Sequence, residues 1–132
     1  MKTTAADQND RHVKRVLVVD DNRPSAQTLA WVMEMNGYDV RACFDGRTAV
    51  ETAHEFHPDI VLLDLGMPVM DGYEVCRRLR QDESLADVLV IAQTGWGGDA
   101  ERRRTAEVGF NHHMTKPVDF AALMHFIDAT IH

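Results

Sequence analysis

The chain has 132 residues and a formal net charge of −7, with 45% hydrophobic and 27% charged residues. This length and composition are typical of one soluble globular domain with its own hydrophobic core. The acidic balance argues against a surface built to bind nucleic-acid phosphates or anionic lipid. Neither a nucleic acid nor a membrane is therefore expected as a direct partner.

No segment predicts secretion or membrane insertion. The N-terminal stretch MKTTAADQNDRHVKR lacks the apolar core of a signal peptide, and no run of about eighteen residues is apolar throughout. Cys43 and Cys76 do not have the spacing of a metal site and are interpreted as reduced thiols. We expect a cytoplasmic protein in which residues 1–14 form a flexible tail and residues 15–132 form a single domain.

Apolar runs that predict strands alternate with amphipathic stretches that predict helices. Pro24 is placed to open the first helix and Asn36-Gly37 to end it, and Asp45 and Asp119 are predicted N-caps of the second and last helices. The predicted strands cover residues 15–20, 38–44, 59–64, 87–94 and 111–115, and the predicted helices cover 24–35, 46–57, 72–80, 99–108 and 120–131. This alternation predicts an α/β fold with a parallel sheet and helices on both of its faces.

The last two helices differ in how much apolar surface they offer. The helix at 99–108 has only Ala100, Ala106 and Val108 as apolar anchors, so it is expected to be the most loosely held element. The final helix is predicted to bury one apolar stripe, made of Phe120, Leu123, Met124, Ile127 and Ile131.

Polar side chains gather at the predicted carboxyl ends of four strands. Asp20 and Asp21 follow the first strand, Asp64 ends the third within LLDLGMPVMDGYE, Thr94 ends the fourth, and Lys116 follows the fifth. Each has an ordinary explanation by itself, such as a helix cap or a solvated lysine. Three carboxylates at one sheet edge repel one another, however, so the group makes sense mainly if a divalent cation neutralises it. Oxygen ligands alone favour Mg²⁺.

A carboxylate beside a metal ion and an ammonium group can attack a phosphoryl group and become an aspartyl phosphate, and Asp64 is the predicted nucleophile. This set of residues resembles the receiver domain of two-component response regulators, and the likeness runs from about Arg15 to Ile131. The segments DLGMPVMDGYE and TGWGGDAERRR are most similar to receivers attached to hybrid sensor kinases. The resemblance implies a flavodoxin-like (βα)5 three-layer sandwich with strand order 2-1-3-4-5.

The resemblance also implies a role for each residue at the sheet edge. The roles are Asp20 and Asp21 as the acidic pair for Mg²⁺, Asp64 as phosphoacceptor and metal ligand, Thr94 as switch hydroxyl, and Lys116 as the phosphate-binding lysine. The backbone carbonyl of Gly66 would be a further metal ligand, and Lys116-Pro117 would be a cis peptide bond.

Some positions depart from the family's pattern. Gly66 stands where a side chain more often touches the phosphoryl group, and Trp96 either restricts water at the pocket or simply packs on its loop. His113 replaces the aromatic ring that moves inward on activation, so it either acts with Thr94 as a switch or serves only packing. Gln93, in an apolar strand, is expected to be a buried amide with satisfied hydrogen bonds.

The implied partner is a histidine kinase or a histidine phosphotransfer domain. Helical spacing places Leu29, Val32 and Met33 on the core side of the first helix. Trp31 and Met35 fall on the outer side. Trp31 folds back onto the domain, or is an exposed apolar residue without a function, or forms with Met35 and Pro117 the surface on which the phosphodonor docks.

The function expected from the sequence is Mg²⁺-dependent transfer of a phosphoryl group from a partner phosphohistidine to Asp64. The protein would be a monomer or weak dimer, and no enzyme beyond its own aspartyl phosphorylation and dephosphorylation. The alternative is an interaction module that keeps the fold but works without phosphorylation. Haloacid-dehalogenase chemistry is less favoured because Asp20 and Asp21 are adjacent rather than spaced as Asp-x-Asp. A flavodoxin-type cofactor site would need glycine in the loop after the first strand, which has none.

Overall fold

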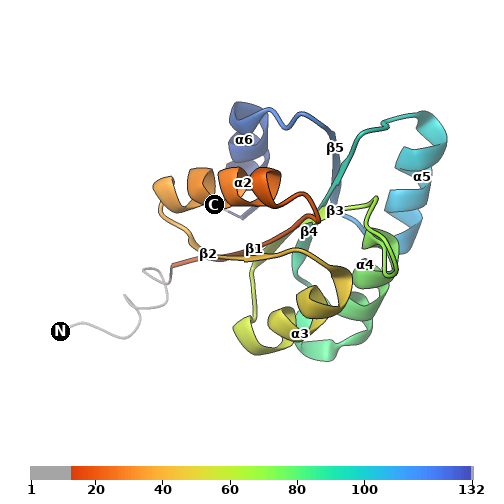
Figure 1. The fold of residues 1–132 in the computed structure, drawn as a ribbon, viewed down its shortest axis with the longest axis horizontal. Coiled ribbons are helices and arrows are strands. Elements are labelled where there is room, and N and C mark those ends of the chain that lie inside the picture. The colour runs from red at the N-terminus through yellow and green to blue at the C-terminus, as the bar shows by residue number, and fades with distance from the viewer. Residues whose placement is uncertain (1–12, 132) are drawn as a thin grey trace.

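The computed structural model describes residues 13–131, and within them five parallel strands form one sheet with the order β2-β1-β3-β4-β5 (Figure 1). The strands are β1 (Arg15–Val19), β2 (Asp39–Cys43), β3 (Ile60–Asp64), β4 (Leu89–Thr94) and β5 (His112–Thr115). The helices are α2 (Arg23–Met35), α3 (Gly46–Phe56), α4 (Gly72–Gln81), the short 3-10 helix η1 (Glu83–Leu85), α5 (Asp99–Val108) and α6 (Phe120–Ile131). The predicted fold class and strand order are confirmed. The predicted flexible tail lies almost wholly outside the described residues.

Local capping chemistry explains where the helices begin. Asp45 accepts a hydrogen bond from the Thr48 N–H at 2.8 Å, and Asp119 accepts one from the Ala122 N–H at 3.0 Å, as predicted. Asn22 caps α2 one residue earlier than the sequence suggested, with Pro24 in the first turn. The 3-10 helix η1 was not predicted. It begins where the Asp82 side chain accepts a hydrogen bond from the Ser84 N–H at 2.9 Å.

The sheet separates two hydrophobic cores. Side chains of β4 alternate between them, because Leu89 and Ile91 pack with α2 and α6, whereas Val90 and Ala92 pack with α3 and α4. Figure 1 shows α2 and α6 above the sheet and α3 and α4 below it. The middle strand β3 is buried along its whole length, as expected for a parallel strand covered on both faces.

The structure corrects three predicted burial patterns. In α2 the buried residues are Ala26, Leu29 and Met33, while Val32 is only half-buried. In α5 the predicted anchors Ala100 and Ala106 are exposed, and Thr105 is the one buried residue of this fully described helix. In α6 the buried residues are Leu123 and Ile127, whereas Phe120, the first residue of the helix, is 38% exposed.

Gly72 lets α4 begin directly against the end of β3. A Cβ atom at Gly72 would collide with the backbone carbonyl oxygen of Asp64 and would lie 2.9 Å from the Leu65 Cα. The Gly72 N–H also donates to the Leu65 carbonyl at 3.3 Å. The absence of a side chain at this position therefore fixes the backbone on which Asp64 is carried.

Gly72→Ala is expected to lower the free energy of unfolding by about 1 to 3 kcal/mol, because backbone atoms cannot move aside as a flexible side chain would. Gly95→Ala is the matched control, since a Cβ there meets nothing within 4 Å. Urea denaturation of both variants measures the difference. Equal stability of the two variants would contradict the proposed close packing.

Candidate functional site

Three carboxylates meet at the carboxyl edge of the sheet, as the sequence predicted. Asp20 follows β1 and is 3% exposed, Asp64 ends β3 and is 6% exposed, and Asp21 is exposed beside them. One carboxylate oxygen from each lies within 4.8 Å of the others. Such a spacing suits three oxygen ligands of one small cation.

Lys116 partly neutralises this cluster from the end of β5. Its Nζ donates to Asp20 Oδ2 at 2.9 Å and lies 3.5 Å from Asp64 Oδ1. Backbone amides hold the same two carboxylates, because Asn22 N–H donates to Asp20 Oδ1 at 2.9 Å and Gly66 N–H donates to Asp64 Oδ1 at 3.1 Å. The side chains are thus fixed by the chain itself before any ligand binds.

The electrostatics of the site follow from burial and charge. Burial, together with the nearby charge of Asp20, raises the pKa of Asp64 to about 6, although the Gly66 N–H and Lys116 act in the opposite direction. Burial would lower the pKa of Lys116, but its hydrogen bond to Asp20 and the charge of Asp64 raise that pKa above its ordinary value. Lys116 therefore stays protonated, and a cation added to the cluster would favour ionised Asp64.

Thr94 and His113 occupy the neighbouring strands β4 and β5 and are both buried. Thr94 Oγ1 accepts a hydrogen bond from the Trp96 N–H at 3.1 Å. His113 Nδ1 lies 3.3 Å from Thr105 Oγ1 of α5, and burial lowers the pKa of His113. His113 Nε2 is buried and has no hydrogen-bond partner among residues 13–131. The imidazole thus connects the sheet to the single buried residue of α5.

The other predicted residues lie around this centre rather than in it. Trp31 and Met35 are 63% and 69% exposed on α2, so Trp31 does not fold back into the core. Trp96 is 71% exposed, and its indole lies against the backbone position of Gly98. The predicted cis peptide bond at Lys116-Pro117 is present.

Sequence reasoning missed two contributors and misjudged a third. Asn22 is not among the residues that the sequence assigns to the site, and the contact of Thr105 with His113 joins two elements that no local pattern connects. Gln93 is 3% exposed, but its Nε2 has no hydrogen-bond partner within the described part of the chain, so the expected satisfied amide is wrong. The only signal for Gln93 was its polarity within an apolar strand.

A family model described as the response regulator receiver domain matches residues 16–128. The chain belongs to this family. The DNA-binding dual master transcriptional regulator RpaA of Synechocystis is 34% identical over 110 residues, which are 83% of this chain and 46% of RpaA. The chain thus spans about half the length of this curated relative.

Two solved receivers illustrate the structural likeness. The chemotaxis protein CheY4 of Vibrio cholerae has a TM-score of 0.85 at 24% identity, covering 90% of this chain and 99% of CheY4, which shows the shared fold. The receiver domain of the sensor histidine kinase PA1611 from Pseudomonas aeruginosa has a TM-score of 0.81 at 29% identity, covering 89% of this chain and 96% of that one. That structure has a magnesium ion coordinated in its active-site cleft. The neighbour from a sensor kinase agrees with the predicted likeness to kinase-attached receivers.

Across residues 13–131, every helix is too short or too polar to cross a bilayer. The name of RpaA describes a DNA-binding protein, so the expectation that the present chain has no nucleic-acid partner stays a prediction.

Asp64→Asn is expected to stabilise the metal-free protein at neutral pH. An unfolded aspartate has a pKa of about 3.9, so between about pH 4 and pH 6 the folded chain binds more protons than the unfolded one. The contribution of Asp64 to the free energy of unfolding is therefore fully present below about pH 4 and is lost as the pH rises towards 6. At neutral pH the buried, ionised carboxylate lowers the free energy of unfolding by roughly 2 to 3 kcal/mol. The variant removes that cost.

Urea denaturation in EDTA at about pH 4 and about pH 7.5 tests this expectation. Asp64→Asn should exceed the wild type only at the higher pH. Asp87→Asn, at an exposed aspartate just before β4, is the matched control and should show no such difference. A gain for Asp64→Asn that is the same at both pH values would contradict the assignment.

Proposed function

We propose that this receiver domain accepts a phosphoryl group on Asp64 from a phosphohistidine of a histidine kinase or histidine phosphotransfer domain. The observation that supports this most strongly is the geometry around Asp64. A buried carboxylate sits between two further carboxylates and a lysine whose Nζ is 3.5 Å away. A sheet edge with a purely structural role would gain nothing from this arrangement, because three carboxylates beside a single lysine repel one another.

The donor set fits Mg²⁺. Asp20, Asp21 and Asp64 offer only carboxylate oxygens, the exposed Asp21 leaves room for water, and the Gly66 carbonyl is the proposed further ligand. Mg²⁺ when bound would neutralise negative charge on the phosphoryl oxygens. Magnesium in the related receiver of PA1611 supports this choice.

The chain's own residues would carry out the transfer as follows. An Asp64 carboxylate oxygen forms a bond to phosphorus while the bond from phosphorus to the donor's imidazole nitrogen breaks, and the imidazole leaves with the bonding electron pair. Lys116, now held by Asp20, is placed to pair with a phosphoryl oxygen. The Gly66 N–H keeps the Asp64 side chain oriented.

The proposed switch consists of Thr94, His113 and α5. Phosphorylation would draw Thr94 Oγ1 away from the Trp96 N–H and towards a phosphoryl oxygen. His113 and Thr105 would transmit that change, because their contact ties β5 to α5. Helix α5 is easy to shift, since Thr105 alone is buried within it and its N-cap, Gly98, has no side chain to cap it.

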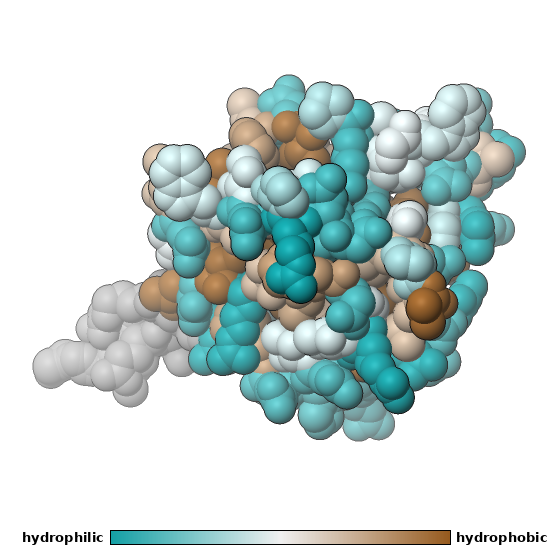
Figure 2. Space-filling model, viewed as in Figure 1, coloured by the Kyte–Doolittle hydropathy of each residue, from teal (hydrophilic) through white to brown (hydrophobic). Residues whose placement is uncertain are grey.

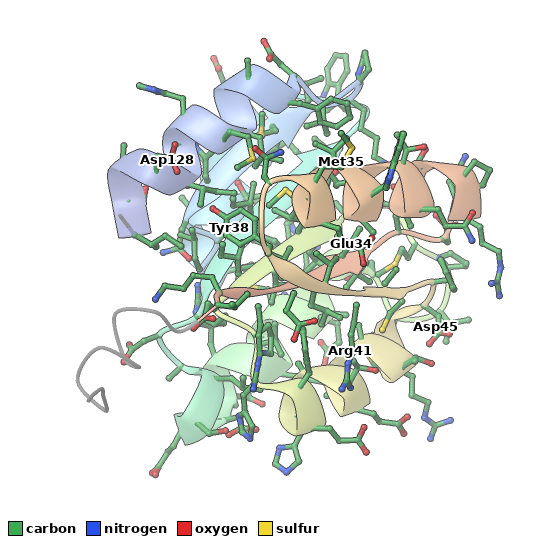
Figure 3. The ribbon with its side chains drawn as sticks, turned by 90° about the vertical axis from the view of Figure 1, so that its left-hand side faces the viewer. Glu34, Met35, Tyr38, Arg41, Asp45 and Asp128 are labelled. Carbon is green, nitrogen blue, oxygen red and sulfur yellow. The ribbon has the colours of Figure 1, made fainter. Side chains whose placement is uncertain are left out.

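The proposed docking surface for the phosphodonor consists of Trp31, Met35 and Pro117. All three are exposed. Figure 3 labels Met35 at the C-terminal end of α2, the helix that shares a core with α6. An exposed tryptophan beside a methionine suits a transient helix contact. We further propose a cytoplasmic monomer or weak dimer that catalyses only its own phosphorylation and dephosphorylation.

Labelling with acetyl phosphate tests the proposed function. Incubation of the wild type with acetyl phosphate and Mg²⁺ should add one phosphoryl group at Asp64, as detected by intact and tandem mass spectrometry. EDTA, Asp64→Asn and Asp21→Asn should each suppress the mass gain. Asp87→Asn should label as the wild type does. If Asp64→Asn labels normally, the assignment of the phosphoacceptor is wrong, and if the wild type does not label, the fold serves as an interaction module.

A further inference from the structure

Helix α5 is in contact with one aromatic side chain of α4, that of Tyr73. Arg104 of α5 lies over the face of the Tyr73 ring, with its Cζ 3.8 Å from the ring centroid. Phe110, just beyond the end of α5, meets the same ring in an edge-to-face arrangement with 6.1 Å between the centroids. Figure 1 shows this end of α5 beside the start of α4. One ring thus contacts the α5 segment at two places.

The contact with Tyr73 matters because α5 has few other anchors. Thr105 is the one buried residue among the ten of this helix, all of which the structure describes. Figure 2 shows a largely hydrophilic surface over α5, at the right of the view. A guanidinium group over an aromatic face is attracted by the ring even where water reaches the pair. The stack of Arg104 on Tyr73 is therefore a substantial part of what fixes the position of α5.

Tyr73 itself belongs to the rigid centre of the domain. It is 4% exposed and packs in the core between the sheet and the helices α3 and α4. It also follows Gly72, the residue whose missing side chain lets α4 pack against the carbonyl of Asp64. The Tyr73 ring is thus fixed relative to the phosphoacceptor strand, whereas Arg104 moves with α5.

The hydroxyl of Tyr73 makes no hydrogen bond. Its Oη is buried and has no partner among residues 13–131. Burial and the nearby Glu101 carboxylate raise the pKa of Tyr73 to about 12, so the hydroxyl keeps its proton. A phenylalanine would fill the same space without leaving a buried donor unpaired, which lowers stability. The hydroxyl is explained if α5 has a second position in which an acceptor reaches it.

Glu101 is the acceptor closest to hand for that second position. It lies one turn before Arg104 on the same face of α5, where residues three apart are about 5 to 6 Å from each other. Its carboxylate acts on the pKa of the Tyr73 hydroxyl, although no hydrogen bond joins the two groups. Because Glu101 is part of the helix that covers the hydroxyl, a short shift of α5 is enough to bring them together. No group has to enter from solvent.

We propose that Tyr73 sets the balance between two positions of α5. In the resting position, Arg104 stacks on the ring and the hydroxyl is unpaired. In the shifted position, which phosphorylation of Asp64 favours, the stack opens and Tyr73 Oη donates a hydrogen bond to Glu101. This inference rests on the proposed function, because that function supplies the reason for α5 to move.

Two variants should change the affinity for beryllofluoride, a phosphoryl analogue, in opposite directions. Arg104→Gln removes the stack that holds the resting position, so the apparent affinity in the presence of Mg²⁺ should rise by about two- to fivefold. Tyr73→Phe keeps the ring but removes the hydroxyl, so the apparent affinity should fall by about two- to tenfold. Titrations followed by amide NMR shifts measure both values. Urea denaturation should show that Tyr73→Phe unfolds no more easily than the wild type.

Amide hydrogen exchange in residues 99–108, without beryllofluoride, tests the stack by itself. Exchange there should be about two- to fivefold faster in Arg104→Gln than in the wild type, and no faster in Tyr73→Phe. Arg103→Gln is the matched control, since Arg103 is exposed on the same helix and carries the same charge. It should behave as the wild type does in both measurements.

Equal exchange in Arg104→Gln and the wild type would overturn the proposal. So would beryllofluoride affinities of Arg104→Gln and Tyr73→Phe that do not move in opposite directions. If Arg103→Gln reproduces the effects of Arg104→Gln, the cause is net charge and the proposal is again wrong. Failure of the wild type to bind beryllofluoride would instead refute the proposed function, while the exchange rates would still decide whether the stack holds α5.

Discussion

The rest of the site depends on one charge balance, in which Lys116 holds Asp20 at 2.9 Å and approaches Asp64 at 3.5 Å. One ammonium group cannot neutralise three carboxylates, so the cluster keeps excess negative charge. Burial, together with the charge of Asp20, raises the pKa of Asp64 to about 6. That imbalance is what a divalent cation would relieve. Once a cation binds the carboxylates, Lys116 would be free to release Asp20 and pair with a phosphoryl oxygen instead. The chemistry proposed for Asp64 follows from this arrangement of charges.

The fold brings the charged side chains together, because it places the ends of their strands side by side and fixes the backbone at each end. Asp20 and Asp64 come from adjacent strands, and each carboxylate is held by an amide two residues further along the chain. Gly72 allows α4 to pack against the carbonyl of Asp64, so the proposed nucleophile is carried by a rigid element. Helix α5 is held differently, through the contact of Thr105 with His113. A rigid centre beside a weakly anchored helix is the arrangement that a phosphorylation-driven switch requires.

Local sequence patterns predicted most of this fold because continuous apolar runs, caps and turn residues act over a few residues. Asp45 and Asp119 were identified as caps by type and position alone, and the site aspartates by their place after apolar strands. The failures concern contacts between distant segments. Thr105 could not be identified as the anchor of α5, because its partner His113 lies on another strand. The exposure of Phe120 and the unpaired amide of Gln93 depend on how α2 and α6 meet above the sheet, which no local pattern specifies.

The central claim is that the acidic cluster binds a divalent cation with Asp64 among the ligands. A Mg²⁺ titration followed by amide NMR shifts tests it most directly, with Asp21→Asn and Asp87→Asn measured in parallel. The account predicts saturable shifts at Asp20, Asp21, Asp64 and Gly66, a large loss of affinity in Asp21→Asn, and an unchanged affinity in Asp87→Asn. Shifts that do not saturate at millimolar Mg²⁺, or an affinity that is the same in Asp21→Asn as in the wild type, would contradict it.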